Sequence, residues 1–135
     1  MMKVLILEDA KIGGLALQAL KERGIDGSWF ISVKSVDSFT LTGLRSDRSE
    51  ETIRLADYGL AMVDGFLLID GLMGWDVLPW LKPLMLTVGT SSVGGIGADI
   101  DIDKAEMVEK LDTLLETARK FSSLSLADSS TLTAA

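Results

Sequence analysis

The side chains of this sequence that could do chemistry are carboxylates, hydroxyls and lysines. The chain contains no Cys, which excludes disulfides and thiolate metal sites, and no His, which removes the commonest general base and every triad that needs one. Acids or hydroxyls stand where apolar runs of the sequence stop, and a lysine follows the last such run: Glu8, Asp9, Asp64, Thr87 and Lys104. These residues can act together only if the fold brings them to one place.

Asp64 ends the run Leu60-Ala61-Met62-Val63, which has no polar face. Such a run is typical of a strand in the middle of a parallel sheet, covered above and below. A buried carboxylate without a partner costs several kcal/mol, so Asp64 is predicted to face solvent at the carboxyl end of its strand. Open α/β sheets bind their ligands at that edge. The alternative is that Asp64 merely ends a strand. The other residues at the same edge of the sheet decide between the two interpretations.

Composition narrows the class of protein. The chain has 135 residues, of which 47% are hydrophobic, which is typical of one globular domain. No apolar run approaches the ~20 residues of a membrane span, and the first residues do not form a signal peptide. The net charge of −7 argues against sequence-independent binding to nucleic acid. We expect a soluble cytoplasmic protein that binds neither a membrane nor nucleic acid directly.

Hydrophobic patterns predict alternating strands and helices. The first helix is predicted over 11–23, with Gly24 to end it. A short helix is expected from about Asp76 to before Pro83, with Pro79 in its first turn, and a last one after Asp103, which can cap it. The predicted strands cover 3–7, 29–33, 59–63, 84–88 and about 99–102.

Three segments are harder to interpret. The pattern of residues 36–48 does not determine their structure. Residues 39–42 alternate like a strand and could form a hairpin with 29–33. Ser49 can instead cap a short helix through Ala56, and we favour this helix. Residues 91–97 carry too many glycines for a good helix. Residues 122–135 are small and polar, and are predicted to be a disordered tail.

Five fragments occur in an order and spacing that resemble the receiver domain of two-component response regulators (CheY-like) over residues 1–121. They are KVLILED at 3–9, the strand ending in Asp64, GWDVL at 74–78, LMLT at 84–87 and GADIDIDK at 97–104. The resemblance implies a flavodoxin-like, doubly wound (βα)5 three-layer sandwich. Its parallel sheet would have the order 2-1-3-4-5, and its fourth helix would be short or degenerate.

The resemblance also implies roles. Asp64 would accept a phosphoryl group from the phosphohistidine of a histidine kinase or phosphotransfer protein, Thr87 would bind that group and act as the switch, and Lys104 would pair with it. Glu8, Asp9, Asp64 and the carbonyl of Phe66 would hold Mg²⁺, which prefers oxygen ligands. A carboxylate needs no general base to act as the nucleophile. The protein would be no enzyme beyond Mg²⁺-dependent autophosphorylation and autodephosphorylation.

The sequence departs from the family pattern at several positions. The loop from Asp64 to Gly74 is longer than usual and lacks its proline. Val88 follows Thr87 where a small residue is usual, and its branched side chain would crowd the phosphoryl site. If Thr90 is instead the switch residue, the small Ser91 follows it and the crowding disappears.

Other departures affect the cis peptide and the signalling surface. Ala105 follows the lysine in place of proline, so a cis peptide, which costs ~3–4 kcal/mol without proline, is not expected. Asp101 stands where the family has its switch aromatic.

Two functions, and a third less favoured, remain open. The chain would be a stand-alone, phosphorylatable receiver, or a pseudo-receiver that binds partners without phosphorylation. A haloacid-dehalogenase-like phosphatase is suggested by VDGFL at 63–67, but Phe66 stands where that family needs a second aspartate. The apolar loop after Asp64, with Leu68 and Leu72, is predicted to mediate partner binding or homodimerisation together with Trp75 and Trp80.

Overall fold

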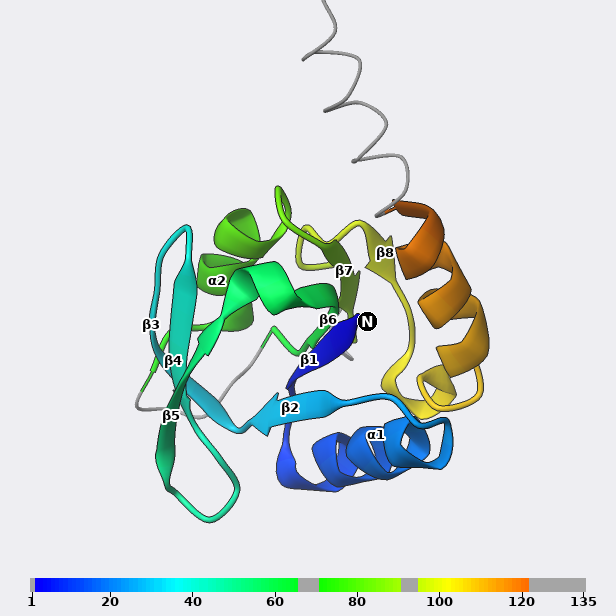
Figure 1. The fold of residues 1–135 in the computed structure, drawn as a ribbon, viewed down its shortest axis with the longest axis horizontal. Helices are drawn as coiled ribbons and strands as arrows, with labels where there is room; N and C mark the ends of the chain where they lie inside the picture. Colours follow the sequence, from blue (N-terminus) through cyan, green and yellow to red (C-terminus); the bar gives the residue numbers. More distant parts are fainter. Residues whose placement is uncertain (1, 66–70, 91–94, 122–135) are drawn as a thin grey trace, which may run out of the picture.

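Five parallel strands form the central sheet of the computed structural model, which describes residues 2–65, 71–90 and 95–121 (Figure 1). Their spatial order is β2 (Gly27–Phe30), β1 (Lys3–Leu7), β6 (Tyr58–Val63), β7 (Leu86–Gly89) and β8 (Ile100–Asp101). All neighbouring pairs are parallel. Counting only these strands along the chain, the order is 2-1-3-4-5, which confirms the prediction of a flavodoxin-like fold.

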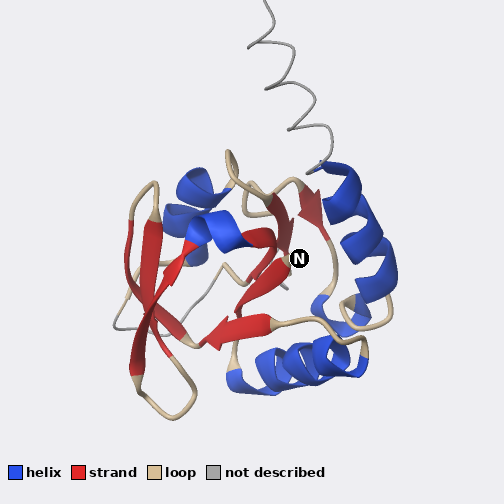
Figure 2. Ribbon diagram, viewed as in Figure 1, coloured by secondary structure: helices blue, strands red, loops and turns tan. Residues whose placement is uncertain are grey.

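Strand alternation divides the core into two layers. Val4, Ile6 and Met62 face a layer closed by α1 (Ala10–Glu22) and the helix over 111–121, which buries Leu111 and Ala118. Residues at the alternate positions, such as Leu5 and Val63, face a second layer. This layer is closed by α2 (Gly74–Leu81) and by a small antiparallel sheet (Figure 2). Because successive strand residues point to opposite faces, each side chain's layer follows from its position in the strand.

The small sheet corrects the prediction of a helix over 49–56. Its strands are β3 (Ser32–Val36), β4 (Thr40–Leu44) and β5 (Glu50–Arg54), paired in that order. Leu41 and Ile53 lie opposite each other and are buried against the central sheet. The alternative prediction, a hairpin, is closer to the structure than the helix is. Its strands differ from the predicted 29–33 and 39–42, because β3 begins at Ser32 and β4 begins at Thr40. A short 3₁₀ turn, η1 (Leu55–Asp57), leads into β6.

The helix ends differ in detail from the predictions. Gly24 ends α1 with a positive φ of 69°, as predicted. However, α2 begins at Gly74, so Pro79 lies in its second turn and not in its first. Asp103 accepts a hydrogen bond from the N–H of Ala105 at 3.1 Å, but it caps the 3₁₀ turn η2 (Lys104–Glu106), and the last helix begins only at residue 111.

Several predictions fall on residues 66–70, 91–94 and 122–135, which lie outside the described residues. They concern the carbonyl of Phe66, the apolar side chain of Leu68 and the tail. Within residues 95–99 the crossover to β8 contains no helix, in line with a degenerate fourth helix. Over the described ranges, no helix is long and apolar enough to cross a membrane.

Candidate functional site

Glu8 and Asp64 follow directly after two adjacent central strands, β1 and β6. They continue the alternation of Ile6 and Met62, so they extend the same side of the sheet as these core residues. Glu8 is fully buried and Asp64 is only 5% exposed. The prediction that Asp64 faces solvent is therefore wrong, and a cation must compensate for the burial of its charge.

Lys104 is that cation. Its Nζ lies 2.7 Å from Asp64 Oδ2, 2.7 Å from Asp9 Oδ2 and 3.6 Å from Glu8 Oε2. Burial opposes the ammonium charge, but the hydrogen bonds to Asp64 and Asp9 and the charge of Glu8 raise the pKa of Lys104 above its usual value. The Lys104 side chain thus joins the segment after β8 to the segments that directly follow β1 and β6.

Asp9 has two functions in this arrangement. It is the N-cap of α1, where its Oδ1 accepts a hydrogen bond from the N–H of Ile12 at 2.9 Å, while its Oδ2 faces Lys104. Partial burial would raise the pKa of Asp9, but the Ile12 N–H and the Lys104 ammonium outweigh it and hold that pKa below its usual value. The helix cap therefore fixes one carboxylate of the site in its ionised form.

Glu8 is the least satisfied of the three acids. Neither of its carboxylate oxygens has a hydrogen-bond partner among the described residues. Burial, together with the nearby charges of Asp64 and Asp9, raises the pKa of Glu8 to about 8, although Lys104 opposes the shift. A buried acid without hydrogen bonds fits a position that a bound cation would satisfy.

The three acids fit a small divalent cation. One oxygen from each of Glu8, Asp9 and Asp64 can be chosen so that all lie within 4.8 Å of one another. Mg²⁺ prefers carboxylate oxygens, usually a few of them together with water. The donor set and the unbonded oxygens of Glu8 therefore suit Mg²⁺, and the predicted fourth ligand, the carbonyl of Phe66, lies outside the described residues.

Thr87 is not part of this cluster, contrary to the prediction that it would lie beside Asp64. It pairs with Ala61, three positions before Asp64, and its position in the alternation places it on the opposite face of the sheet. Its hydroxyl donates to Asp99 Oδ2 at 2.9 Å and accepts from the N–H of Asp99 at 3.0 Å. Thr87 therefore holds the crossover to β8 against the sheet.

Thr90 lies where Thr87 was expected. Its N–H donates to the carbonyl of Val63 at 3.0 Å, which places it level with Asp64, and it continues the alternation of Leu86 and Val88 on the face of the acids. The hydroxyl is buried and has no hydrogen-bond partner among the described residues. Val88 is buried in the core one step below, so it does not crowd the site.

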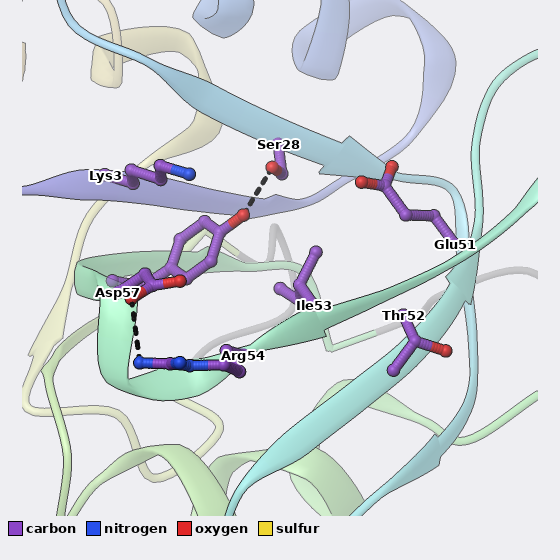
Figure 3. A pocket seen from close by; sticks show the side chains of 8 residues that line it. Lys3, Ser28, Glu51, Thr52, Ile53, Arg54 and Asp57 are labelled. Carbon is purple, nitrogen blue, oxygen red and sulfur yellow. Dashed lines mark hydrogen bonds and ion pairs between the residues drawn. The ribbon is translucent and has the colours of Figure 1, made fainter.

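The opposite end of the sheet carries a separate cleft of about 330 Å³ (Figure 3). Two basic and two acidic side chains line it, and Arg54 pairs with Asp57 at 3.6 Å while Ser28 bonds Tyr58 at 2.6 Å. Because basic and acidic side chains are equal in number, the charge of the lining favours neither an anionic nor a cationic ligand. The lining residues are Lys3, Ser28, Glu51, Thr52, Ile53, Arg54, Asp57 and Tyr58.

Comparison with known proteins places the fold. No family profile and no curated protein matches the sequence. Among solved structures, a signal receiver domain from Vibrio parahaemolyticus has a TM-score of 0.62 at 18% identity, covering 91% of this chain and 93% of its own. The receiver domain of Francisella response regulator 1452 has a TM-score of 0.60 at 17% identity, covering 90% and 99%.

A longer protein shares the same fold over part of its length. NtrX from Brucella abortus matches with a TM-score of 0.65 at 21% identity, and the match covers 96% of this chain but 30% of NtrX. At these identities the likeness concerns the fold. Together with the strand order, it shows that this chain has the fold of response-regulator receiver domains.

Proposed function

We propose that this protein is a phosphorylatable receiver domain that accepts a phosphoryl group on Asp64 in the presence of Mg²⁺. The donor would be the phosphohistidine of a histidine kinase or phosphotransfer protein, and the signal would leave through protein contacts. The single observation that carries the proposal is the gathering of Glu8, Asp9, Asp64 and Lys104 from three distant segments within hydrogen-bond or ligand distance. The unbonded hydroxyl of Thr90 beside them supports it.

Phosphoryl transfer to Asp64 needs little covalent chemistry from the protein. A carboxylate oxygen of Asp64 attacks phosphorus, the bond from phosphorus to the donor imidazole nitrogen breaks, and that nitrogen keeps the electron pair. Catalysis then rests on positioning and on neutralising the phosphoryl oxygens. Mg²⁺ held by Glu8, Asp9 and Asp64 would supply positive charge for those oxygens.

Lys104 and Thr90 would complete the site. The Lys104 ammonium bonds Asp64 and Asp9, and it lies close enough to exchange one of these carboxylates for a phosphoryl oxygen. The Thr90 hydroxyl can donate to a second phosphoryl oxygen without breaking a hydrogen bond to any described residue. Thr90 thereby takes the role first assigned to Thr87.

The test is phosphorylation by acetyl phosphate, followed by intact-mass spectrometry. The wild type should gain one phosphoryl adduct with Mg²⁺ and none with EDTA. Asp64→Asn should abolish the adduct, and Lys104→Ala should slow its formation at least ~10-fold, as for the loss of a charge-stabilising group. Asp99→Asn, on the opposite face of the sheet, serves as the control and should react like the wild type.

A non-phosphorylated pseudo-receiver is the second candidate, and the crossover region favours it. Within the described residues 95–99 no fourth helix forms, and Asp101 replaces the expected aromatic. Trp75 and Trp80 on α2 are 42% and 43% exposed and could serve partner binding or self-association in either case, whereas Leu72 packs partly against the core. Mg²⁺ binding without any adduct at Asp64 would decide for this second candidate.

A further inference from the structure

Trp29 connects the edge strand β2 to the backbone of the acidic pair. Its indole Nε1–H donates to the carbonyl oxygen of Glu8 at 3.1 Å. The side chain is partly buried and packs against the core layer beneath α1. The peptide group between Glu8 and Asp9 is therefore held by a side chain that does not itself belong to the cluster of acids.

The first turns of α1 are shaped around this indole. A methyl group added at Gly13 would lie 2.0 Å from Trp29 Nε1 and 2.2 Å from its Cε2, far inside van der Waals contact. The neighbouring Gly14 has no heavy atom within 4 Å of the same position. A glycine inside a helix lowers helix stability by about 1 kcal/mol relative to alanine. Gly13 is explained by the indole, which occupies the space that an alanine side chain would need.

Other bonds hold the same turn. Asp9 caps α1 through the N–H of Ile12, and the N–H of Gly13 donates to the carbonyl of Asp9 at 2.9 Å. The indole thus lies between the Glu8 carbonyl and the helix that Asp9 caps. Moving it would alter the directions in which the Glu8 and Asp9 side chains leave the backbone.

We propose that Trp29 is a positioning residue for the acidic pair: through its hydrogen bond to the Glu8 carbonyl, with Gly13 leaving room for the ring, it sets the affinity of the site for a divalent cation. The inference rests on the proposed function, because it assumes that the acids bind a cation. Partners of this indirect kind typically change metal affinity by ~10–100-fold.

Two pairs of matched variants test the proposal. Trp29→Phe keeps an aromatic ring but removes the donor, and Trp80→Phe makes the same exchange at an exposed site. Gly13→Ala displaces the indole, and Gly14→Ala adds the same methyl group in open space. Circular dichroism and melting curves would first establish that each variant is folded; Gly13→Ala keeps the test available should Trp29→Phe fail to fold.

Two measurements are made on each protein. Calorimetric titration with Mg²⁺ should give a dissociation constant at least ~10-fold higher for Trp29→Phe and Gly13→Ala than for the wild type, Trp80→Phe and Gly14→Ala. In the metal-free proteins, the NMR resonance of the Lys104 ammonium reports the acids that it bonds. This resonance should shift in the first two variants and stay in place in the two controls.

Each outcome decides the proposal. An unchanged Mg²⁺ affinity and an unchanged Lys104 resonance in folded Trp29→Phe and Gly13→Ala would overturn it. If the wild type binds no Mg²⁺, the cation site of the proposed function fails, and with it the link between Trp29 and affinity. The Lys104 resonance in the metal-free variants still decides in that case whether Trp29 positions the acids.

Discussion

Glu8 shows how burial defines the chemistry of a single side chain in this protein. The same adjacent acids on a solvated turn would be ordinary surface residues, but here Glu8 is fully buried and its oxygens lack hydrogen bonds among the described residues. Desolvation favours the neutral form of the acid, whereas a bound cation would favour the ionised form. Stability and metal binding should therefore both depend on pH.

In the metal-free protein, stability should fall as pH rises from about 5 to 8. The pKa of Glu8 is about 8 in the folded state against 4.5 ordinarily, so between these values the folded protein holds a proton that the unfolded chain has lost. Stability from this proton is complete below the lower pKa and is lost as pH rises through the higher one. Each pKa unit is worth about 1.4 kcal/mol.

Urea unfolding in EDTA at several pH values would measure this dependence. Glu8→Gln cannot ionise and should flatten the slope, while Asp26→Asn at the surface should not. Mg²⁺ affinity of the wild type should rise over the same range, because binding must displace the Glu8 proton. A slope that is the same in wild type and Glu8→Gln would contradict the prediction.

Thr87 and Thr90 should respond oppositely to truncation. Thr87→Ala removes two hydrogen bonds to Asp99 and should cost about 1–3 kcal/mol of unfolding free energy with little effect on the phosphorylation rate. Thr90→Ala removes a hydroxyl without a partner among the described residues, so stability should hardly change while phosphorylation slows. Urea unfolding and acetyl phosphate kinetics test both, and the reverse pattern would restore Thr87 as the switch.

Sequence reasoning placed the acids and the lysine together, as they lie in the structure, but it put Thr87 beside them in place of Thr90, for a physical reason. The acids directly follow their strands, so an error in the strand limits does not move them. The predicted strand 84–88 is in fact Leu86–Gly89, and only pairing with β6 fixes which residue stands level with Asp64. The feature of the sequence that pointed to Thr90 was the small residue after it, Ser91.

The antiparallel sheet β3–β5 was missed because local helix signals competed with pairing between distant residues. Glu50 and Glu51 after Ser49 favour a helix start, but the partner strand β4 overrides that preference. Two aspartates marked the turns: Asp37 accepts hydrogen bonds from the N–H groups of Phe39 and Thr40, and Asp47 accepts from that of Ser49. These turns enclose the alternating residues of β4.

Gly43→Ala should test the close packing of this sheet. A methyl group on Gly43 would lie 2.7 Å from the carbonyl oxygen of Ser32 and 2.9 Å from the ring of Phe30, so the backbone must shift. Overpacking of this kind costs about 1–3 kcal/mol. Thermal unfolding should show a lower melting temperature for Gly43→Ala but not for Gly14→Ala, and an unchanged melting temperature in both would argue against the β3–β4 pairing.

The acidic cluster also joins parts of the chain that the sequence keeps far apart. Lys104 bonds Asp9 and Asp64, which precede it by 95 and 40 positions. These bonds connect the ends of β1 and β6 to the segment after β8. The global stability of the domain should therefore respond to changes within the cluster.

Removing the lysine should make the domain less stable without metal and more responsive to Mg²⁺. In Lys104→Ala the three acids lose the ammonium that offsets their repulsion, so the metal-free melting temperature should fall. The same loss leaves more negative charge for a cation, so Mg²⁺ should bind more tightly and raise the melting temperature further than in the wild type. Binding at 100 times the dissociation constant stabilises the folded state by about 2.7 kcal/mol.

Asp64→Asn is the opposite control, because it removes a ligand and a negative charge together. Its melting temperature should respond little to Mg²⁺, and Lys110→Ala, which breaks only a surface ion pair with Glu106, should respond like the wild type. Melting curves at several Mg²⁺ concentrations rank the four proteins. A smaller Mg²⁺ response in Lys104→Ala than in the wild type would mean that the lysine does not compete with the cation, and that the two do not share the carboxylates of Asp9 and Asp64.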